Sequence, residues 1–432
     1  MTPPIGDRIE PEPVRLLHVE LEMDGPVRAV GRIAWREGRI YFEYDPSFPG
    51  LSLPISPFHL PFSPGVIEGR REPFQGLHGL FNDSVPDGWA RLLLDRRLSQ
   101  IGVLPSSLTP LDRLACVGSR GMGALRYRPE YPAPRDHKRR RIDLDRIADE
   151  AQKVLAGDAT QVLESLLDLG GSSGGARPKV LIGCDRSKKK LVHGVDDLSA
   201  GYRHWLLKFR STTDAIDVGA VEYAYSQMAS AAGVDMTETF LFPSHKGPGY
   251  FGTERFDRAD NIRIHAHTLG GLLYADHRLP TVGYQTLLKT TRALTRSQVE
   301  VERVFRRMVF NVFAHNRDDH TKNHSFLMSK DGSWRASPAY DITFSSGPGG
   351  EHAMDIGGEG RAPTEDNIAV VAKEVGVSAV FAKQCIEEVR DAVHQWPGFA
   401  ADSGVSTAQT KLIDKRLNGI RKRGRSAGHS RS

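Results

Sequence analysis

The stretch NRDDHTKNHS, residues 316–325, concentrates acids, imidazoles, amides and a lysine directly after an apolar helical pattern. Asp318 and Asn323 stand five positions apart, as the aspartate and asparagine do in the catalytic loop of protein kinases. In that chemistry the aspartate accepts or orients the proton of the attacking hydroxyl, and the asparagine oxygen holds Mg²⁺. Lys322 between them would stabilise charge on a transferring phosphoryl group. The spacing therefore predicts a phosphotransfer loop, provided that the other parts of such a site follow in order.

Two other interpretations of the same residues stay open. His320 and His324 have the i, i+4 spacing that places two imidazoles on one helical face, as in zinc hydrolases. The glutamate that the HExxH motif needs next to its first histidine is absent, because Thr321 stands there. The stretch also suits a solvated polar turn after a helix, which requires no ligand.

Two further residues, one on each side of this stretch in the sequence, have positions that suit the active site of a kinase. Asp341 lies eighteen positions after Asn323 in SWRASPAYDITFS, where a kinase needs its second metal-binding aspartate. Alternatively, Asp341 caps a turn. Upstream, Lys208 interrupts the apolar run HWLLKF, which suits a strand lysine that holds nucleotide phosphates. Such a lysine also often lies at a strand edge with its charge in solvent.

A glycine-rich segment, GGSSGGARPK at residues 170–179, precedes the β-branched run KVLI. Small residues allow the close backbone approach that a phosphate-binding loop requires. The segment matches neither the Walker A motif nor the GxGxxG motif, and a flexible linker is the alternative. The order glycine-rich loop, strand lysine, Asp-x4-Asn and later aspartate makes phosphoryl transfer the leading hypothesis.

The patterns along the chain predict an α+β fold with two lobes of protein-kinase-like architecture. Residues 14–45 form a β-meander with turns at Asp24-Gly25 and Glu37-Gly38. We expect four parts: a β-rich N-terminal subdomain, an ATP-binding N lobe with the glycine-rich loop, a mostly helical C-terminal lobe with the catalytic loop, and a disordered basic tail. Their predicted bounds are 1–128, 129–262, 263–415 and 416–432.

Two helix starts are also expected. A helix begins near Pro86, where Ser84 or Asp87 can cap it. A second begins at residues 295–298, where Thr295 and Gln298 have capping-box spacing.

Composition limits the class of protein. The 432 residues are 39% hydrophobic and 26% charged, which is ordinary for a globular chain of two or three structural units. The N-terminus lacks the order of a signal peptide, and no apolar run is long enough to span a bilayer. Three distant cysteines without a CxxC pair fit a reducing compartment. We expect a cytoplasmic protein with no membrane partner.

The basic excess is clustered. Net charge is +5, and the clusters are RDHKRRR at residues 135–141, the lysine triplet 188–190 and six basic residues without an acid in 416–432. Such runs favour phosphate-bearing or acidic partners, although each also suits a linker, a solvated loop or a tail.

Beyond these patterns, the chain resembles the HipA family of serine/threonine kinases, the toxin half of many bacterial toxin–antitoxin pairs. The resemblance is carried by segments in one order from about residue 80 to 345: SVPDGWARLLL, LDRLACVGSRGMGALRYRPE, GGSSGGARPK, YFGTERFDR, NRDDHTKNHSF and SPAYDITFS. Arg177 departs from the glutamine common in the family, and His324 from a phenylalanine or isoleucine. Neither departure removes a catalytic group.

The resemblance implies roles for individual residues. Asp318 would be the catalytic base, and Asn323 and Asp341 the Mg²⁺ ligands. It also implies autophosphorylation in the glycine-rich loop at Ser172, or at the adjacent Ser173, which ejects that loop and silences the kinase. The residues implied to contact ATP are Gly174, Gly175, Ala176, Arg177, Pro178 and Lys179 in the loop, Lys208, the hinge residues Glu254, Arg255 and Phe256, and His320, Lys322 and Tyr340.

The expected activity is transfer of the γ-phosphoryl group of Mg-ATP to a protein serine or threonine. The resemblance implies a translation component, such as an aminoacyl-tRNA synthetase, as the target. It also implies a HipB-like DNA-binding antitoxin as partner, with DNA reached only through that antitoxin. The alternative is a catalytically weak ATP-binding scaffold that acts with an antitoxin on operator DNA.

Overall fold

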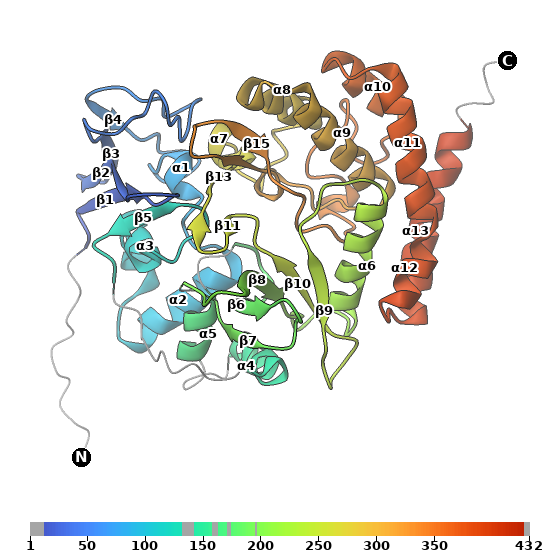
Figure 1. Cartoon of the computed structure of the whole chain (residues 1–432), viewed down its shortest axis with the longest axis horizontal. Helices are drawn as coiled ribbons and strands as arrows, with labels where there is room; N and C mark the ends of the chain where they lie inside the picture. The colour runs from blue at the N-terminus through green and yellow to red at the C-terminus, as the bar shows by residue number, and fades with distance from the viewer. Residues whose placement is uncertain (1–12, 132–141, 158–162, 171–173, 195–196, 427–432) are drawn as a thin grey trace. The chain divides into compact units, whose positions relative to one another are not determined.

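The computed structural model describes residues 13–131, 142–157, 163–170, 174–194 and 197–426. The chain divides into two compact units (Figure 1). The first unit contains residues Met1–Thr212 and Asp257–His265, and the second contains Thr213–Phe256 and Ala266–Ser432. Each unit mixes helices and strands, as the predicted α+β class requires. No described helix is long and apolar enough to cross a membrane.

The first unit opens with the predicted meander. Leu17, Val19 and Leu21 of its first strand are buried and alternate with exposed or half-buried residues, the period of two typical of a half-buried strand. Glu37 and Gly38 both have positive φ, 51° and 76°, which suits the two-residue hairpin turn between the paired residues Arg36 and Arg39. These strands form a sheet of order β4-β3-β2-β1-β5 from β1 (Leu16–Leu21), β2 (Arg28–Arg36), β3 (Arg39–Tyr44), β4 (Val66–Glu68) and β5 (Leu125–Arg128).

A second antiparallel array in the first unit carries the glycine-rich loop. Its strands, in the order β7-β6-β8, are β6 (Lys179–Asp185), β7 (Leu191–His193) and β8 (Tyr202–Lys208). The remaining elements of the unit are α1 (Gly79–Asn82), α2 (Gly88–Gln100), α3 (Pro110–Val117), α4 (Leu144–Ala156), α5 (Leu163–Gly170), β11 (Arg258–Ala259) and β12 (Ile262–Arg263). The strand predicted around Lys208 is thereby confirmed.

The second unit is mostly helical. The long apolar helix α9 (Gln298–Phe313) packs against α8 (Tyr284–Thr295), α11 (Ala379–His394) and α13 (Thr407–Ser426). The other elements are β9 (Thr239–Phe242), β10 (Tyr250–Glu254), β13 (His265–Thr268), β14 (Ser325–Met328), β15 (Trp334–Ala336), α6 (Val218–Ala231), α7 (Leu269–Leu273), α10 (Glu365–Glu374) and α12 (Trp396–Asp402). Helix α9 ends immediately before the stretch NRDDHTKNHS, so the packed core fixes the start of that loop.

Three local predictions are wrong. Ser297, not Thr295, caps α9 by accepting the backbone N–H of Glu300, because Thr295 is the last residue of α8. Neither side chain proposed for the start of α2 caps it: the Ser84 hydroxyl accepts a hydrogen bond from Tyr127, and the backbone of Asp87 occupies the cap position without a side-chain capping bond. Residues 416–426 are not a disordered tail, since they continue α13, and residues 427–432 lie outside the described part of the chain.

Candidate active site

The loop after α9 brings Asp318 and Asn323 together. A short 3-10 helix, Thr321–Asn323, turns the chain so that the Nδ2 of Asn323 donates to the backbone carbonyl of Asp318 at 2.6 Å. The side chain of Asp318 is 53% exposed, and the Nε2 of His320 lies 3.9 Å from its Oδ1. The predicted base is therefore open to a reacting group, while the backbone beneath it is fixed.

Asp319, for which no sequence pattern predicted a role, anchors this loop. Its carboxylate is fully buried and accepts hydrogen bonds from the Tyr284 hydroxyl at 2.8 Å, from His352 Nδ1 at 2.8 Å and from the backbone N–H of Ala353 at 2.9 Å. Asn311 of α9 in turn donates to the Tyr284 hydroxyl at 2.8 Å. Burial raises the pKa of Asp319, but the charge and hydrogen bond of His352 and the hydrogen bond from Tyr284 outweigh it and lower that pKa overall.

His320 and His324, the two histidines of the zinc hypothesis, contact different residues. His320 packs edge-on against His277, whereas His324 is buried against Tyr284, with ring centroids 5.2 Å and 5.8 Å apart. Burial and the nearby Arg307 lower the pKa of His324 to about 3. Because a 3-10 turn separates the two residues, the helical spacing assumed for a shared face does not exist. Among the described residues, no group of three or more His, Cys, Asp or Glu side chains could hold a metal ion.

Tyr340 joins the loop to the segment that carries Asp341. Its hydroxyl donates to the carbonyl of Lys322 at 2.5 Å and lies 2.6 Å from the Ser325 hydroxyl. Asp341 follows with a φ of 57°, a left-handed conformation that aspartate tolerates better than most residues. The two predicted Mg²⁺ ligands, Asn323 and Asp341, thus belong to segments that one tyrosine holds together.

The predicted hinge lies at the end of β10. Glu254 is the last residue of this strand, and Arg255 is buried directly after it. The ring of Phe256 packs on the ring of Tyr340, with centroids 5.2 Å apart. The hinge segment and the Asp341 segment therefore meet within the second unit.

The other predicted nucleotide residues belong to the first unit. Lys179 and Lys208 stand directly opposite each other on β6 and β8, so that both side chains point to the same face. Two cationic side chains on one face suit the binding of an anionic phosphate. Lys179 is buried and its Nζ donates to the carbonyl of Gly174, which connects the glycine-rich loop to this face.

The start of α2 holds the same loop. Asp87 accepts the backbone N–H of Gly175 at 2.7 Å, and the backbone N–H of Trp89 donates to the carbonyl of Gly175 at 2.9 Å. Gly88 has a φ of 46°, and a Cβ at this position would lie 2.2 Å from that carbonyl oxygen. Sequence reasoning missed this contact and placed Asp87 as a helix cap. Only the fold brings residues 88 positions apart into contact.

We predict that Asp87→Ala frees the Gly175 amide. A hydrogen bond to a charged group contributes about 1.5–3 kcal/mol, so hydrogen exchange of this amide should become roughly ten to a hundred times faster. Asp87→Asn keeps an accepting oxygen and should show a smaller change. Hydrogen–deuterium exchange mass spectrometry of peptides that contain Gly175 measures both variants, and unchanged exchange in Asp87→Ala would contradict the role.

Some sequence predictions fall outside the described residues. These are the autophosphorylation candidates Ser172 and Ser173 and the whole basic run at residues 135–141. The described part of the glycine-rich loop begins at Gly174.

Comparisons with known proteins agree with this architecture. The family model for the HipA-like C-terminal domain matches residues 171–396, and the model for the HipA N-terminal domain matches residues 23–128. No curated protein matches this sequence.

Solved structures provide a comparison of folds. The HipA protein of Shewanella oneidensis MR-1, solved in a complex of the toxin–antitoxin system with HipB and operator DNA, superposes with a TM-score of 0.63 at 15% identity, covering 94% of this chain and 99% of that one. The Helicobacter pylori proinflammatory kinase CtkA matches 50% of this chain and 92% of its own length at 11% identity. Its TM-score of 0.32 is too low to support a conclusion. With one family model spanning more than half of its length, the chain belongs to the HipA family.

Proposed function

We propose that this HipA family member is a serine/threonine protein kinase that transfers the γ-phosphoryl group of Mg-ATP to a protein hydroxyl. The observation that carries the proposal is the catalytic loop: an exposed Asp318 carboxylate stands on a backbone that Asn323 and the buried Asp319 hold in place. Asp318 would accept or orient the proton of the attacking hydroxyl. A carboxylate with this role must be accessible from solvent, and the side chain of Asp318 is 53% exposed.

Asn323 and Asp341 would hold the Mg²⁺ ion. The amide nitrogen of Asn323 is used by the Asp318 carbonyl, so its Oδ1 is the atom left to face a cation. When bound, Mg²⁺ would neutralise charge on the phosphate oxygens. The residues thus fit a hard cation with oxygen ligands, and the chain's contribution is to orient them.

The residues proposed to contact the nucleotide are those that the resemblance to the HipA family implies. Lys179 and Lys208 would contact phosphates beside Gly174, Gly175, Ala176, Arg177 and Pro178, and His320 and Lys322 would lie beside the catalytic base. The hinge Glu254, Arg255 and Phe256, with Tyr340 packed on Phe256, would contact adenine. The register that places Lys179 opposite Lys208 supports the phosphate role, because it directs two cationic side chains to one face of the strands.

The biological role follows the family. We propose that the protein acts as a HipA-like toxin on a translation component, such as an aminoacyl-tRNA synthetase, and is inactivated by autophosphorylation at Ser172 or Ser173. Since the Shewanella protein was solved with HipB and operator DNA, a HipB-like antitoxin is the proposed partner, with DNA contacted through it.

The test is phosphotransfer by the purified full chain with γ-labelled ATP and Mg²⁺, to itself and to proteins of a cell lysate. We expect label on serine or threonine, lost when Mg²⁺ is chelated and strongly reduced in Asn323→Ala and Asp341→Ala. Phosphoproteomics after induction would then identify the self-modified serine and the target. Binding of ATP without any transfer would contradict the kinase and favour the scaffold that acts with an antitoxin.

A further inference from the structure

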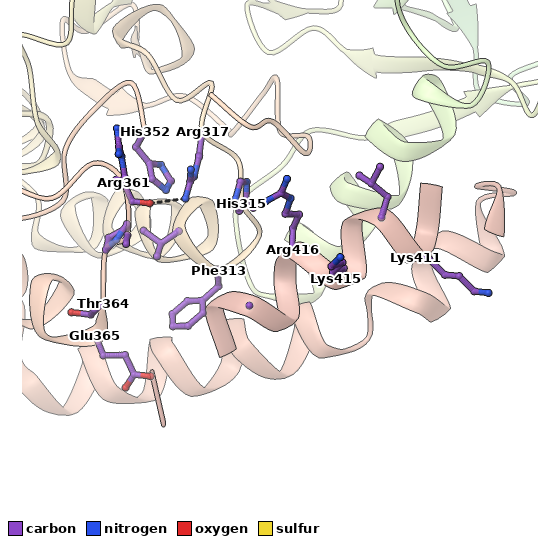
Figure 2. A pocket seen from close by; sticks show the side chains of 15 residues that line it. Phe313, His315, Arg317, His352, Arg361, Thr364, Glu365, Lys411, Lys415 and Arg416 are labelled. Carbon is purple, nitrogen blue, oxygen red and sulfur yellow. Dashed lines mark hydrogen bonds between the residues drawn. The ribbon is translucent and has the colours of Figure 1, made fainter. Parts of the chain in front are cut away.

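A basic cavity of about 870 Å³ lies in the second unit, apart from the residues predicted to bind nucleotide or metal (Figure 2). The end of α9, the segment that leads into α10, and one face of α13 enclose it. None of the predicted site residues lines it. Its size is within the range typical of small-molecule pockets.

The charged residues that line the cavity are mostly positive. Its lining includes the cations Arg317, Arg361, Lys411, Lys415 and Arg416 and a single acid, Glu365. The acid is neutralised by an ion pair with Arg390 of α11, and Arg361 pairs with Glu351.

The cations of α13 have no such compensation. Within the described residues, the side chains of Lys411, Lys415 and Arg416 form no ion pair or hydrogen bond. Lys411 and Lys415 are one turn apart on the same helix, where like charges repel. Figure 2 shows Arg416 rising from α13 toward His315, whereas Lys411 extends along the helix at the margin of the cavity. An uncompensated cluster of this kind favours an anionic ligand.

The remaining lining limits the kind of anion. Val312 and Phe313 are buried and, with Pro363, provide an apolar wall next to the cations. Burial and the neighbouring Arg317 lower the pKa of His315 to about 4, so this histidine is neutral at pH 7 and adds no positive charge to the cavity. A diphosphate concentrates several negative charges within a few ångströms and so matches a cluster of lysine and arginine side chains on one helix.

The cavity lies behind the catalytic loop. Arg317, next to Asp318, donates from Nη2 to the carbonyl of Arg361 at 2.7 Å, the dashed line in Figure 2, and from Nη1 to the carbonyl of Gly350. His352 lines the cavity and also binds the buried Asp319. The side chains of Arg317 and His352 therefore line the cavity and also form hydrogen bonds in or next to the loop that carries Asp318.

We propose that this cavity is a second anion site that binds a small ligand with a diphosphate group, anchored by Lys415 and Arg416. The site differs from the proposed ATP site in every lining residue, and its existence does not depend on kinase activity. The diphosphate can be inorganic or part of a nucleotide whose base contacts the apolar wall.

The test is calorimetric titration of the full chain with inorganic pyrophosphate, without Mg²⁺ or ATP. We expect the double variant Lys415→Ala/Arg416→Ala to bind pyrophosphate at least about tenfold more weakly than wild type, because it removes two charge-assisted contacts to the anion. The matched control, Lys189→Ala/Lys190→Ala, removes two charges from adjacent exposed residues of the first unit and should bind as wild type does. Thermal unfolding checks that both variants fold.

Three results would overturn the proposal: no pyrophosphate binding by wild type, equal binding by wild type and the Lys415→Ala/Arg416→Ala variant, or tighter binding of a hexaglutamate peptide with the same dependence on these two residues. The last result would identify an acidic peptide site.

Parallel titrations with GDP and UDP distinguish the sources of the diphosphate. If GDP or UDP binds more tightly than pyrophosphate, and the Lys415→Ala/Arg416→Ala variant loses this advantage, the natural ligand is a nucleotide. If neither nucleotide binds more tightly than pyrophosphate, the ligand is the inorganic ion.

Discussion

Asp318→Asn is expected to lower the rate of phosphotransfer by about 10²–10⁴-fold, the contribution typical of a positioned acid or base. Asparagine has the same shape as aspartate but cannot accept the proton of the attacking hydroxyl. The side chain is 53% exposed, and it is the backbone carbonyl of Asp318, not its carboxylate, that Asn323 binds. The free energy of unfolding should therefore stay within about 0.5 kcal/mol of wild type, as for most surface substitutions.

The measurement is incorporation of label from γ-labelled ATP, with urea unfolding of the same preparations. Asp331→Asn is the matched control, because it makes the same chemical change in an exposed turn between β14 and β15. A rate for Asp318→Asn within twofold of wild type would show that Asp318 is not the base.

Asp319→Ala is expected to destabilise the protein by roughly 3–5 kcal/mol, the cost typical of removing one partner of a buried charge pair. The substitution leaves the Tyr284 hydroxyl, the His352 ring and the Ala353 N–H without their common acceptor in a site that excludes water. Asp319→Asn should cost less, because its remaining oxygen can still accept some of these bonds. Phosphotransfer should fall in both variants, since the backbone next to Asp318 loses its anchor.

The effect of Asp319 should depend on pH. Its pKa in the folded state is below the ordinary value of about 3.9, so the carboxylate stabilises the fold at pH values above about 4. This contribution is lost as the pH falls through the lowered folded-state pKa. The difference in unfolding free energy between wild type and Asp319→Asn should therefore shrink below pH 4.

Urea unfolding at pH 7 and below pH 4 measures this dependence. Asp391→Asn, an exposed position on α11, is the control that should show no such loss. Equal stability of Asp319→Ala and wild type at pH 7 would exclude the anchoring role.

Several features were readable from the sequence because local patterns determine them. The alternation of Leu17, Val19 and Leu21 and the Glu37-Gly38 turn predicted the meander, since strand period and turn conformation depend on neighbouring residues. The apolar stripe of residues 298–313 predicted α9 for the same reason. Its first residue was misplaced, because Thr295 and Ser297 are both good caps and only the end of α8 decides between them.

The sequence by itself therefore determined the family, the α+β class and the order of the segments that carry the predicted chemistry. The tertiary structure decided what neighbouring residues do: Asp318 faces solvent while Asp319 is the buried acceptor for Tyr284 and His352. It likewise made Asp87 a support of the glycine-rich loop and grouped Lys415 and Arg416 with Arg317 around a cavity. The physical reason is that burial and hydrogen bonding between residues tens of positions apart depend on packing, which no local pattern encodes.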